Sequence, residues 1–213
     1  MNLHQPSADT MSRLTAAGLN ADDVVTLVRN TVLEDLAGGV DITSVATVPI
    51  EQRSVVTFGS RAHGCIAGLD VAAAAVEMVC GPDKVTFERV RNDGDRVVPG
   101  DVVARVEAPT QLMLTAERTA LNIVCHLSGV ATATSKWVDA VAGTGAAIRD
   151  TRKTMPLLRA LEKYAVRCGG GQNHRMSLSD AALVKDNHIA AAGGIVPAFE
   201  AVRRTAPGIV IEV

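Results

Sequence analysis

Residues 146–171 read AAIRDTRKTMPLLRALEKYAVRCGGG, an apolar run followed by a basic turn, a helical segment and three glycines. This stretch and its continuation predict strands over 146–150, 182–185 and 209–213, and helices over 157–168 and about 195–205. Strands that alternate with helices indicate βαβ units and a parallel sheet. Each predicted strand ends in charged residues, and the carboxyl ends of parallel strands are where such folds build their sites.

A closed (β/α)₈ barrel needs about 200 residues or more, and far fewer follow Val141. The α/β fold predicted for this part of the chain is therefore unfinished at residue 213. Its last predicted strand, Ile209 to Val213, would present unpaired backbone groups at an edge, which favours association.

The first half of the chain has a different pattern. We expect a flexible tail over 1–20, a helix over 21–36, a turn at 41–43, a strand over 55–58, a small helix over 69–79, alternating strands over 85–111, and a long helix over 115–141 interrupted near Ser128 and Gly129. These elements predict an α+β domain with an antiparallel sheet in the first half of the chain.

The charge distribution points to a site for a small anion. The net charge of −2 argues against a general nucleic-acid binder, which needs a large basic excess. Between Arg149 and His188, however, eight Lys or Arg residues stand against four Asp or Glu, so that this segment carries +4 while the remainder carries −6. Such a basic segment within an acidic chain favours an anion site over a solvated helix face.

The four cysteines, at 65, 80, 125 and 168, lack the spacing of zinc ligands and are expected to be unpaired in a reducing compartment. The amino-terminal residues lack the pattern of a signal peptide, and no run of about 18 apolar residues occurs. We therefore expect a cytoplasmic protein.

A polar stripe lies on the predicted long helix. Arg118, Asn122 and His126 follow one another at intervals of four residues on a helix otherwise rich in Leu, Ile and Val. The stripe must face water, a partner subunit or a ligand. For His126 alone, a structural histidine with a satisfied hydrogen bond is the favoured interpretation, and for Arg118 alone a surface charge is equally plausible.

Three basic motifs follow: Arg149-Asp150-Thr151-Arg152-Lys153-Thr154, then Gly169-Gly170-Gly171-Gln172-Asn173-His174-Arg175, then Lys185-Asp186-Asn187-His188. Arginine offers a bidentate fork for carboxylate or phosphate, and lysine a point charge. The glycines permit a left-handed backbone and a close approach of ligand. Nucleotide-binding fingerprints and nucleophile elbows are missing.

These motifs, together with Thr115-Ala116-Glu117-Arg118-Thr119, Glu34-Asp35 and Asp41-Ile42-Thr43-Ser44, resemble in order those of the quinolinate phosphoribosyltransferase (nicotinate-nucleotide pyrophosphorylase, carboxylating) family. The resemblance runs from about residue 24 to the end. It implies an α+β sandwich domain over 21–112, followed by an α/β barrel-type domain over 113–213, of which only the first part is present. It implies an enzyme of NAD biosynthesis that transfers a phosphoribosyl group from phosphoribosyl pyrophosphate to quinolinate, with Mg²⁺, and releases pyrophosphate and CO₂. It also implies a homodimer or higher homo-oligomer with shared sites.

The resemblance further implies which residues form the site. Lys153 and Lys185 would be catalytic, and substrate would be bound by Arg118, Thr151, Arg152, Lys153, His174, Arg175 and Lys185, with Arg118 reaching a neighbouring subunit's site. No metal ligand is assigned within the chain. The family's ribose- and metal-holding acids correspond to positions beyond residue 213, so we expect a chain truncated at its carboxyl end that binds a dicarboxylate without turning over.

Three alternatives remain. A molybdenum-associated paralogue of the family would act on another acceptor, although the Lys185-Asp186-Asn187-His188 motif favours quinolinate. A non-catalytic subunit could pair with a longer copy. A swinging-arm carrier is suggested by residues 92–101, but it requires an exposed lysine in a following hairpin, and residues 85–135 contain none.

Overall fold

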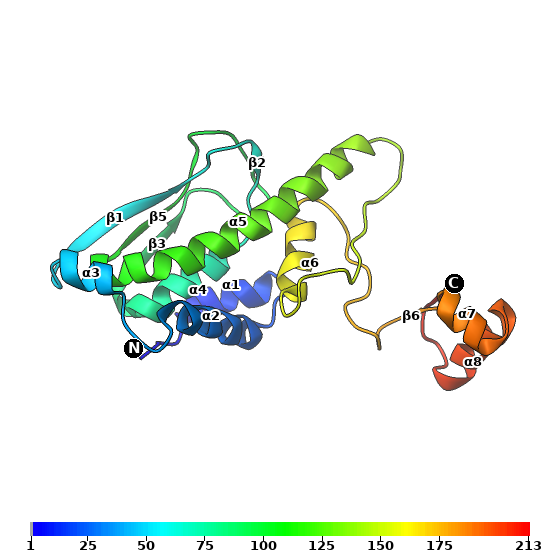
Figure 1. The fold of residues 1–213 in the computed structure, drawn as a ribbon. Helices are drawn as coiled ribbons and strands as arrows, with labels where there is room; N and C mark the ends of the chain where they lie inside the picture. Colours follow the sequence, from blue (N-terminus) through cyan, green and yellow to red (C-terminus); the bar gives the residue numbers. More distant parts are fainter. Residues whose placement is uncertain (1) are drawn as a thin grey trace.

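The amino-terminal half of the molecule is an antiparallel sheet packed against helices, as Figure 1 shows for the computed structural model, which describes residues 2–213. The sheet has the strand order β1–β5–β3. The elements of this half are α1 (Ala8–Ala16), α2 (Ala21–Leu36), α3 (Ile42–Thr47), β1 (Arg53–Gly59), β2 (Gly64–Cys65), α4 (Leu69–Cys80), the 3₁₀ turn Pro82–Lys84, β3 (Thr86–Arg89), β4 (Arg96–Val97) and β5 (Val102–Pro109).

Helix α4 forms the centre of the core. Its sequence, LDVAAAAVEMVC, is apolar apart from Asp70 and Glu77, and every residue of it except Asp70 is buried. The helix contacts α1, α2, the long helix α5 (Thr110–Ala140) and the sheet. Four consecutive alanines allow these neighbours to approach closely, and burial of the flanking apolar side chains is the main stabilising term.

The flexible tail predicted over residues 1–20 is wrong for the part that the structure describes. Helix α1 packs on α4, and Leu14 is fully buried. The buried carboxylate of Glu77 accepts hydrogen bonds from the backbone N–H of Ser7 (2.7 Å), the Ser7 hydroxyl (3.1 Å) and the Thr10 hydroxyl (2.9 Å). A polar segment is thus held by one buried acid, a long-range contact that local composition does not reveal.

The predicted turn at 41–43 is the start of α3. Asp41 is its N-cap and accepts hydrogen bonds from the backbone N–H and the hydroxyl of Ser44. These hydrogen bonds lower the pKa of the Asp41 carboxyl.

Helix α5 (Thr110–Ala140) is a single continuous helix, so the interruption predicted near Ser128 and Gly129 is wrong. The Ser128 hydroxyl binds both the N–H (3.1 Å) and the carbonyl (3.3 Å) of Ala67, and Leu127 beside it is buried. Packing of this face offsets the roughly 1 kcal/mol that a glycine costs inside a helix. The domain boundary predicted at residues 112 and 113 falls inside this helix, which contacts both α4 and α6 (Arg159–Cys168).

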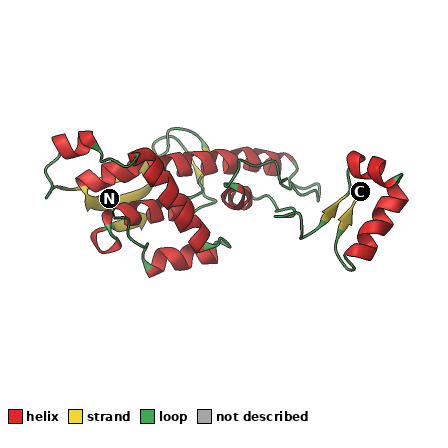
Figure 2. Ribbon diagram, turned by 60° about the horizontal axis from the view of Figure 1, so that its bottom comes forward, coloured by secondary structure: helices red, strands yellow, loops and turns green. Residues whose placement is uncertain are grey.

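The carboxyl-terminal part is smaller and more open. It contains α6 (Arg159–Cys168), β6 (Ala182–Leu183), α7 (Asp186–Ala192), α8 (Ile195–Thr205) and β7 (Ile211–Glu212). Strands β6 and β7 pair in parallel, as predicted, and Figures 1 and 2 show them with α7 and α8 as a unit set apart from the rest. The strand predicted over 146–150 is reduced to one parallel bridge, between Arg149 and Gln172.

Within residues 2–213, no helix combines the length and the hydropathy that crossing a bilayer requires.

Candidate active site

A cavity of about 440 Å³ opens where the basic motifs meet. It is lined by Thr151, Arg152, Lys153, His174, Arg175, Leu183 and Lys185. Six of the seven residues predicted to form the site therefore lie around one cavity, although they come from three segments spread over residues 151–185.

Backbone pairing holds the first two segments of the cavity together. The N–H of Asp150 donates to the carbonyl of Gln172 (3.1 Å), and the N–H of Gln172 donates to the carbonyl of Ile148 (2.8 Å). Because the pairing is parallel, both segments leave it in the same direction. Residues 151–153 and 174–175 therefore emerge side by side at the carboxyl ends of the paired segments.

Hydrogen bonds orient several of the lining groups. The Thr151 hydroxyl accepts from the backbone N–H of Lys153 (3.0 Å), which shapes the first basic turn. One guanidinium nitrogen of Arg175 donates to the carbonyl of Ala181 (2.6 Å). His174 Nε2 lies 2.8 Å from Oε1 of Glu212, at the end of β7. Residues 174 and 175 are thereby linked to the residue before β6 and to β7.

The cavity is strongly cationic. Two arginines and two lysines line it, and Glu212 approaches it only through His174. The Nε of Arg152 is buried and, among residues 2–213, has no hydrogen-bond partner. A buried donor without a partner costs free energy unless a ligand satisfies it. The arrangement thus suits an anion with several acceptor oxygens, such as a carboxylate or phosphate.

Arg118 does not line this cavity. It is exposed on α5. Farther along the same stripe, His126 Nε2 lies 2.8 Å from Oε1 of Glu162 on α6. His126 therefore joins α5 to α6, which agrees with its interpretation as a structural histidine.

The three glycines are packed against helices, and none lines the cationic cavity, contrary to the expectation of a close approach to ligand. A Cβ at Gly169 would lie 2.4 Å from the carbonyl oxygen of Ala131, and one at Gly171 would lie 2.7 Å from Cγ1 of Val166. Gly170 adopts a φ of +86°, which favours glycine. These residues let the end of α6 turn back tightly against α5.

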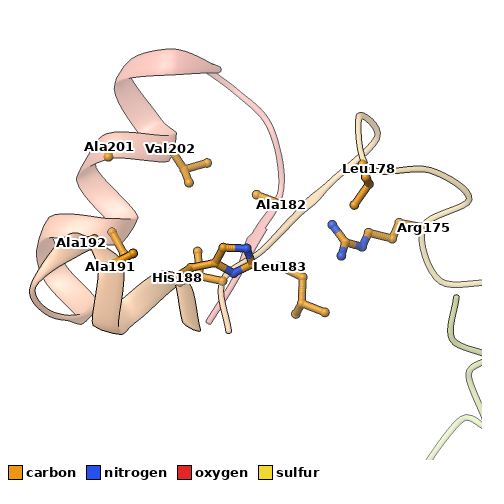
Figure 3. Close-up of a pocket in the computed structure, with 11 residues that line it drawn as sticks. Arg175, Leu178, Ala182, Leu183, His188, Ala191, Ala192, Ala201 and Val202 are labelled. Atoms are coloured by element: carbon orange, nitrogen blue, oxygen red, sulfur yellow. The ribbon is translucent and has the colours of Figure 1, made fainter. Parts of the chain in front are cut away.

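A second, more apolar hollow of about 510 Å³ adjoins the first and shares Arg175 and Leu183 with it. Figure 3 shows Arg175 approaching it from the loop that precedes β6, while Ala191, Ala192 and Val202 line it from α7 and α8. His188, at the start of α7, accepts a hydrogen bond from the N–H of Lys185 at its Nδ1 (2.9 Å).

A dedicated metal cage is not found among residues 2–213, where no group of three His, Cys, Asp or Glu side chains could hold an ion. The cationic cavity itself does not fit a bare metal ion, because its side chains are donors rather than anionic ligands.

Residues that support the site from behind were missed in the sequence. Asp150 and Lys163 form an ion pair beneath the cavity, and Asn173 binds to both. Lys163 has a side-chain exposure of only 1%, and no pattern in the sequence distinguishes it from the surface lysines. Asp150 and Asn173 lie within the basic motifs, and that position was the one available signal.

Two family models match this chain, and together they cover most of it. The family model described as "Quinolinate phosphoribosyl transferase, N-terminal domain" matches residues 41–128, and that of the C-terminal domain matches residues 130–213. The nicotinate-nucleotide pyrophosphorylase (carboxylating) of Mycobacterium leprae is 52% identical over 186 residues, covering 87% of this chain and 66% of the relative. The chloroplastic protein of that name from Arabidopsis thaliana is 39% identical, covering 84% and 51%.

Solved structures show the same family resemblance. The crystal structure of NadC from Streptococcus pyogenes superposes with a TM-score of 0.82 at 38% identity, covering 88% of this chain and 67% of that one. The nicotinate-nucleotide pyrophosphorylase of Francisella tularensis gives a TM-score of 0.83 at 36% identity, covering 90% and 68%. The chain thus spans about two thirds or less of the length of the curated relatives that it matches. Its paired domain matches and its similarity to these structures establish that the chain belongs to the quinolinate phosphoribosyltransferase family.

Proposed function

We propose that the protein transfers a phosphoribosyl group from phosphoribosyl pyrophosphate to quinolinate, with decarboxylation, to give nicotinate mononucleotide, pyrophosphate and CO₂. The observation that carries the proposal is the convergence of Arg152, Lys153, His174, Arg175 and Lys185 on one cavity. Quinolinate is a pyridine dicarboxylate, and two adjacent carboxylates need several cationic donors arranged around them.

The arginines and the lysines would have different roles in the reaction. Arg152 and Arg175 would bind the carboxylates through paired N–H groups, with Thr151 and His174 beside them as further hydrogen-bonding groups. Lys153 and Lys185 would neutralise the negative charge that develops on departing pyrophosphate. Once the pyridine nitrogen is ribosylated it is positively charged, and it stabilises the carbanion left by CO₂. The reaction then needs no general base.

Mg²⁺ is the proposed cofactor and would enter with phosphoribosyl pyrophosphate. Magnesium is usually held through substrate phosphates together with one or two carboxylates. This mode of binding is compatible with a cavity whose own side chains are cationic. When bound, the ion would supply charge neutralisation at the diphosphate.

We also propose that the protein is a homodimer, or a higher homo-oligomer, in which Arg118 completes the site of a neighbouring subunit. Its exposed position on α5, outside the cavity of its own subunit, supports this. In a hybrid of Arg118→Ala and Arg152→Ala subunits, one of the two sites would keep both arginines. Such a hybrid should recover about half of the dicarboxylate-binding capacity, and a verified hybrid that recovers none would contradict a shared site. The cysteines are unpaired, which supports a reducing compartment. We propose that the protein acts in the cytoplasm.

The test combines binding with turnover in the same sample. Purified protein is titrated with quinolinate by calorimetry, and pyrophosphate and CO₂ are then measured after phosphoribosyl pyrophosphate and Mg²⁺ are added. We expect quinolinate to bind, and we expect the 213-residue chain alone not to turn over. Absence of quinolinate binding would contradict the proposed acceptor. Turnover on the order of 1 per second would contradict the expectation that the chain alone is inactive.

The same titration separates the paralogue from the proposed function. Other pyridine and aromatic acids are titrated in parallel with quinolinate under identical conditions. If one of them binds more tightly than quinolinate, the protein is the paralogue with a different acceptor. A non-catalytic subunit is indicated if turnover requires mixing with a longer family member.

A further inference from the structure

A buried ion pair is joined to the residues that line the cationic cavity. The Lys163 ammonium contacts Oδ1 of Asp150, and the two side chains are only 1% and 7% exposed. Neither residue lines the cavity. Burying two charges is costly, and removal of either partner strands the other in a site of low dielectric.

Both oxygens of the Asp150 carboxylate accept hydrogen bonds. Besides Lys163, Oδ1 accepts the backbone N–H of His174 (2.8 Å), and Oδ2 accepts Nδ2 of Asn173 (2.6 Å). The same Asn173 nitrogen also donates to the carbonyl of Lys163 (2.8 Å). An ionised carboxylate offers about four acceptor positions, so it can hold three donors at once, which a neutral amide in its place cannot.

The covalent neighbours of this cluster are the ligand-binding residues. Asp150 directly precedes Thr151, Arg152 and Lys153, which form one arm of the cavity. His174, whose N–H the carboxylate holds, directly precedes Arg175, and these two form the second arm. Asp150 is thus connected to the first arm through the backbone. Its carboxylate is connected to the second arm through the hydrogen bond from the N–H of His174.

We propose that Asp150, held by Lys163 and Asn173, is a positioning residue that fixes the distance between the two arms. It thereby selects two-headed anions, that is, anions with two charged groups, one for each arm. An anion that reaches both arms requires them at a set spacing, whereas one that occupies a single arm does not. The naming of quinolinate as the natural two-headed anion rests on the proposed function, but the geometric inference does not.

The test compares two-headed with single-headed anions in wild-type protein and in Asp150→Asn. Phthalate is the unreactive dicarboxylate, pyrophosphate is a two-headed anion without an aromatic ring, and inorganic phosphate is the single-headed probe. The variant keeps the shape and one acceptor but presents an NH₂ group to the Asn173 donor. We expect phthalate and pyrophosphate to bind about tenfold or more weakly, while phosphate changes by less than about threefold.

A double variant separates positioning from folding. Asp150→Asn combined with Lys163→Met removes both buried charges, which often leaves stability unchanged or raised. We expect its unfolding midpoint to recover relative to Asp150→Asn, while phthalate binding remains weak. The matched control is Asp70→Asn, which disrupts the Asp70–Arg89 pair (2.6 Å, side chains 20% and 14% exposed) in the amino-terminal half. It should lower the midpoint and leave all three affinities unchanged.

Several outcomes would overturn the inference. Phthalate and pyrophosphate affinities within twofold of wild type in both Asp150 variants would show that the carboxylate does not position the arms. A parallel loss of phosphate and phthalate binding would show a general structural role instead. If wild-type protein binds pyrophosphate but no dicarboxylate, the proposed acceptor fails while the pyrophosphate comparison still tests positioning. If it binds neither, both proposals fail.

Discussion

The phenol of Tyr164 donates a 2.6 Å hydrogen bond to Oδ2 of Asp93, and so joins α6 to the turn that precedes β4. The same carboxylate accepts the backbone N–H groups of Gly68 (2.8 Å) and Leu69 (3.1 Å) at the start of α4. One buried acid therefore connects the central helix of the amino-terminal half to the helix beneath the candidate active site.

Replacing Tyr164 by Phe should lower the free energy of unfolding by about 1.5–3 kcal/mol, because a buried carboxylate loses a charge-assisted hydrogen bond. Urea denaturation of the two proteins measures the difference. The ring remains, so the apolar packing of α6 is retained. An unchanged midpoint would show that the hydrogen bond does not stabilise the junction.

The pH dependence of the free energy of unfolding should reflect the titration of Asp93. Burial raises the pKa of its carboxyl in the folded state, and the hydrogen bonds from Tyr164, Gly68 and Leu69 oppose that rise only in part. The folded state therefore binds a proton more tightly than the unfolded state does. The stability from this group is present below the unfolded pKa of about 3.9 and is lost as the pH rises through the folded pKa.

Asp93→Asn removes this titration. The free energy of unfolding of wild type minus that of the variant should fall as the pH rises from about 4, and then level off above the folded pKa. Urea titrations of both proteins at a series of pH values measure this difference. A difference that rises with pH over that range would reverse the sign and contradict the burial argument.

Two glycines should respond oppositely to replacement by alanine. Gly169→Ala places a Cβ 2.4 Å from the Ala131 carbonyl oxygen and should lower stability by about 1–3 kcal/mol. Gly129 lies within α5 with open space around it, so Gly129→Ala should raise stability by about 0.5–1 kcal/mol. Thermal melts of the two variants compare them directly, and a stabilising Gly169→Ala would refute the close contact of α6 with α5.

The thiols should differ in reactivity. Cys125 is exposed, whereas burial raises the pKa of Cys65 and raises those of Cys80 and Cys168 to about 12. Because the thiolate is the reactive form, a disulfide reagent should label one cysteine rapidly in the folded protein and all four after denaturation. Cys125→Ser should abolish the rapid phase. Rapid labelling that persists in this variant would contradict the burial of Cys65 and Cys80 and the partial burial of Cys168.

Local patterns in the sequence predicted many of the elements. The helix predicted over 21–36 coincides with α2, and the antiparallel sheet and the parallel pairing of β6 with β7 follow from strand alternation and the βαβ pattern. The failures involve long-range contacts. Glu77 accepts hydrogen bonds from Ser7 and Thr10, which fixes a segment whose composition predicted a flexible tail. The hydrogen bond of Ser128 to Ala67 holds α5 where the sequence predicted an interruption of the helix.

The cavity was predictable in its composition but not in its support. The basic motifs indicated cationic residues at strand ends, and two arginines and two lysines from these motifs line one cavity. The buried pairing of Asp150 with Lys163 depends on where α6 packs, which no spacing in the sequence specifies. Similarly, the glycine run indicated unusual backbone, but whether the space beside it holds a ligand or a helix is a tertiary property.

The most direct test of the cationic cavity is a thermal melt with phthalate or quinolinate at millimolar concentration, at low and at high salt. Wild-type protein should melt at a higher temperature with either dicarboxylate, and the increase should be smaller at high salt because the attraction is screened. Arg175→Ala should lose most of the increase, whereas Arg96→Ala, which disrupts the exposed Arg96–Asp139 pair, should keep it. No shift with either dicarboxylate, or an equal shift in Arg175→Ala, would contradict the assignment of this cavity as a dicarboxylate site.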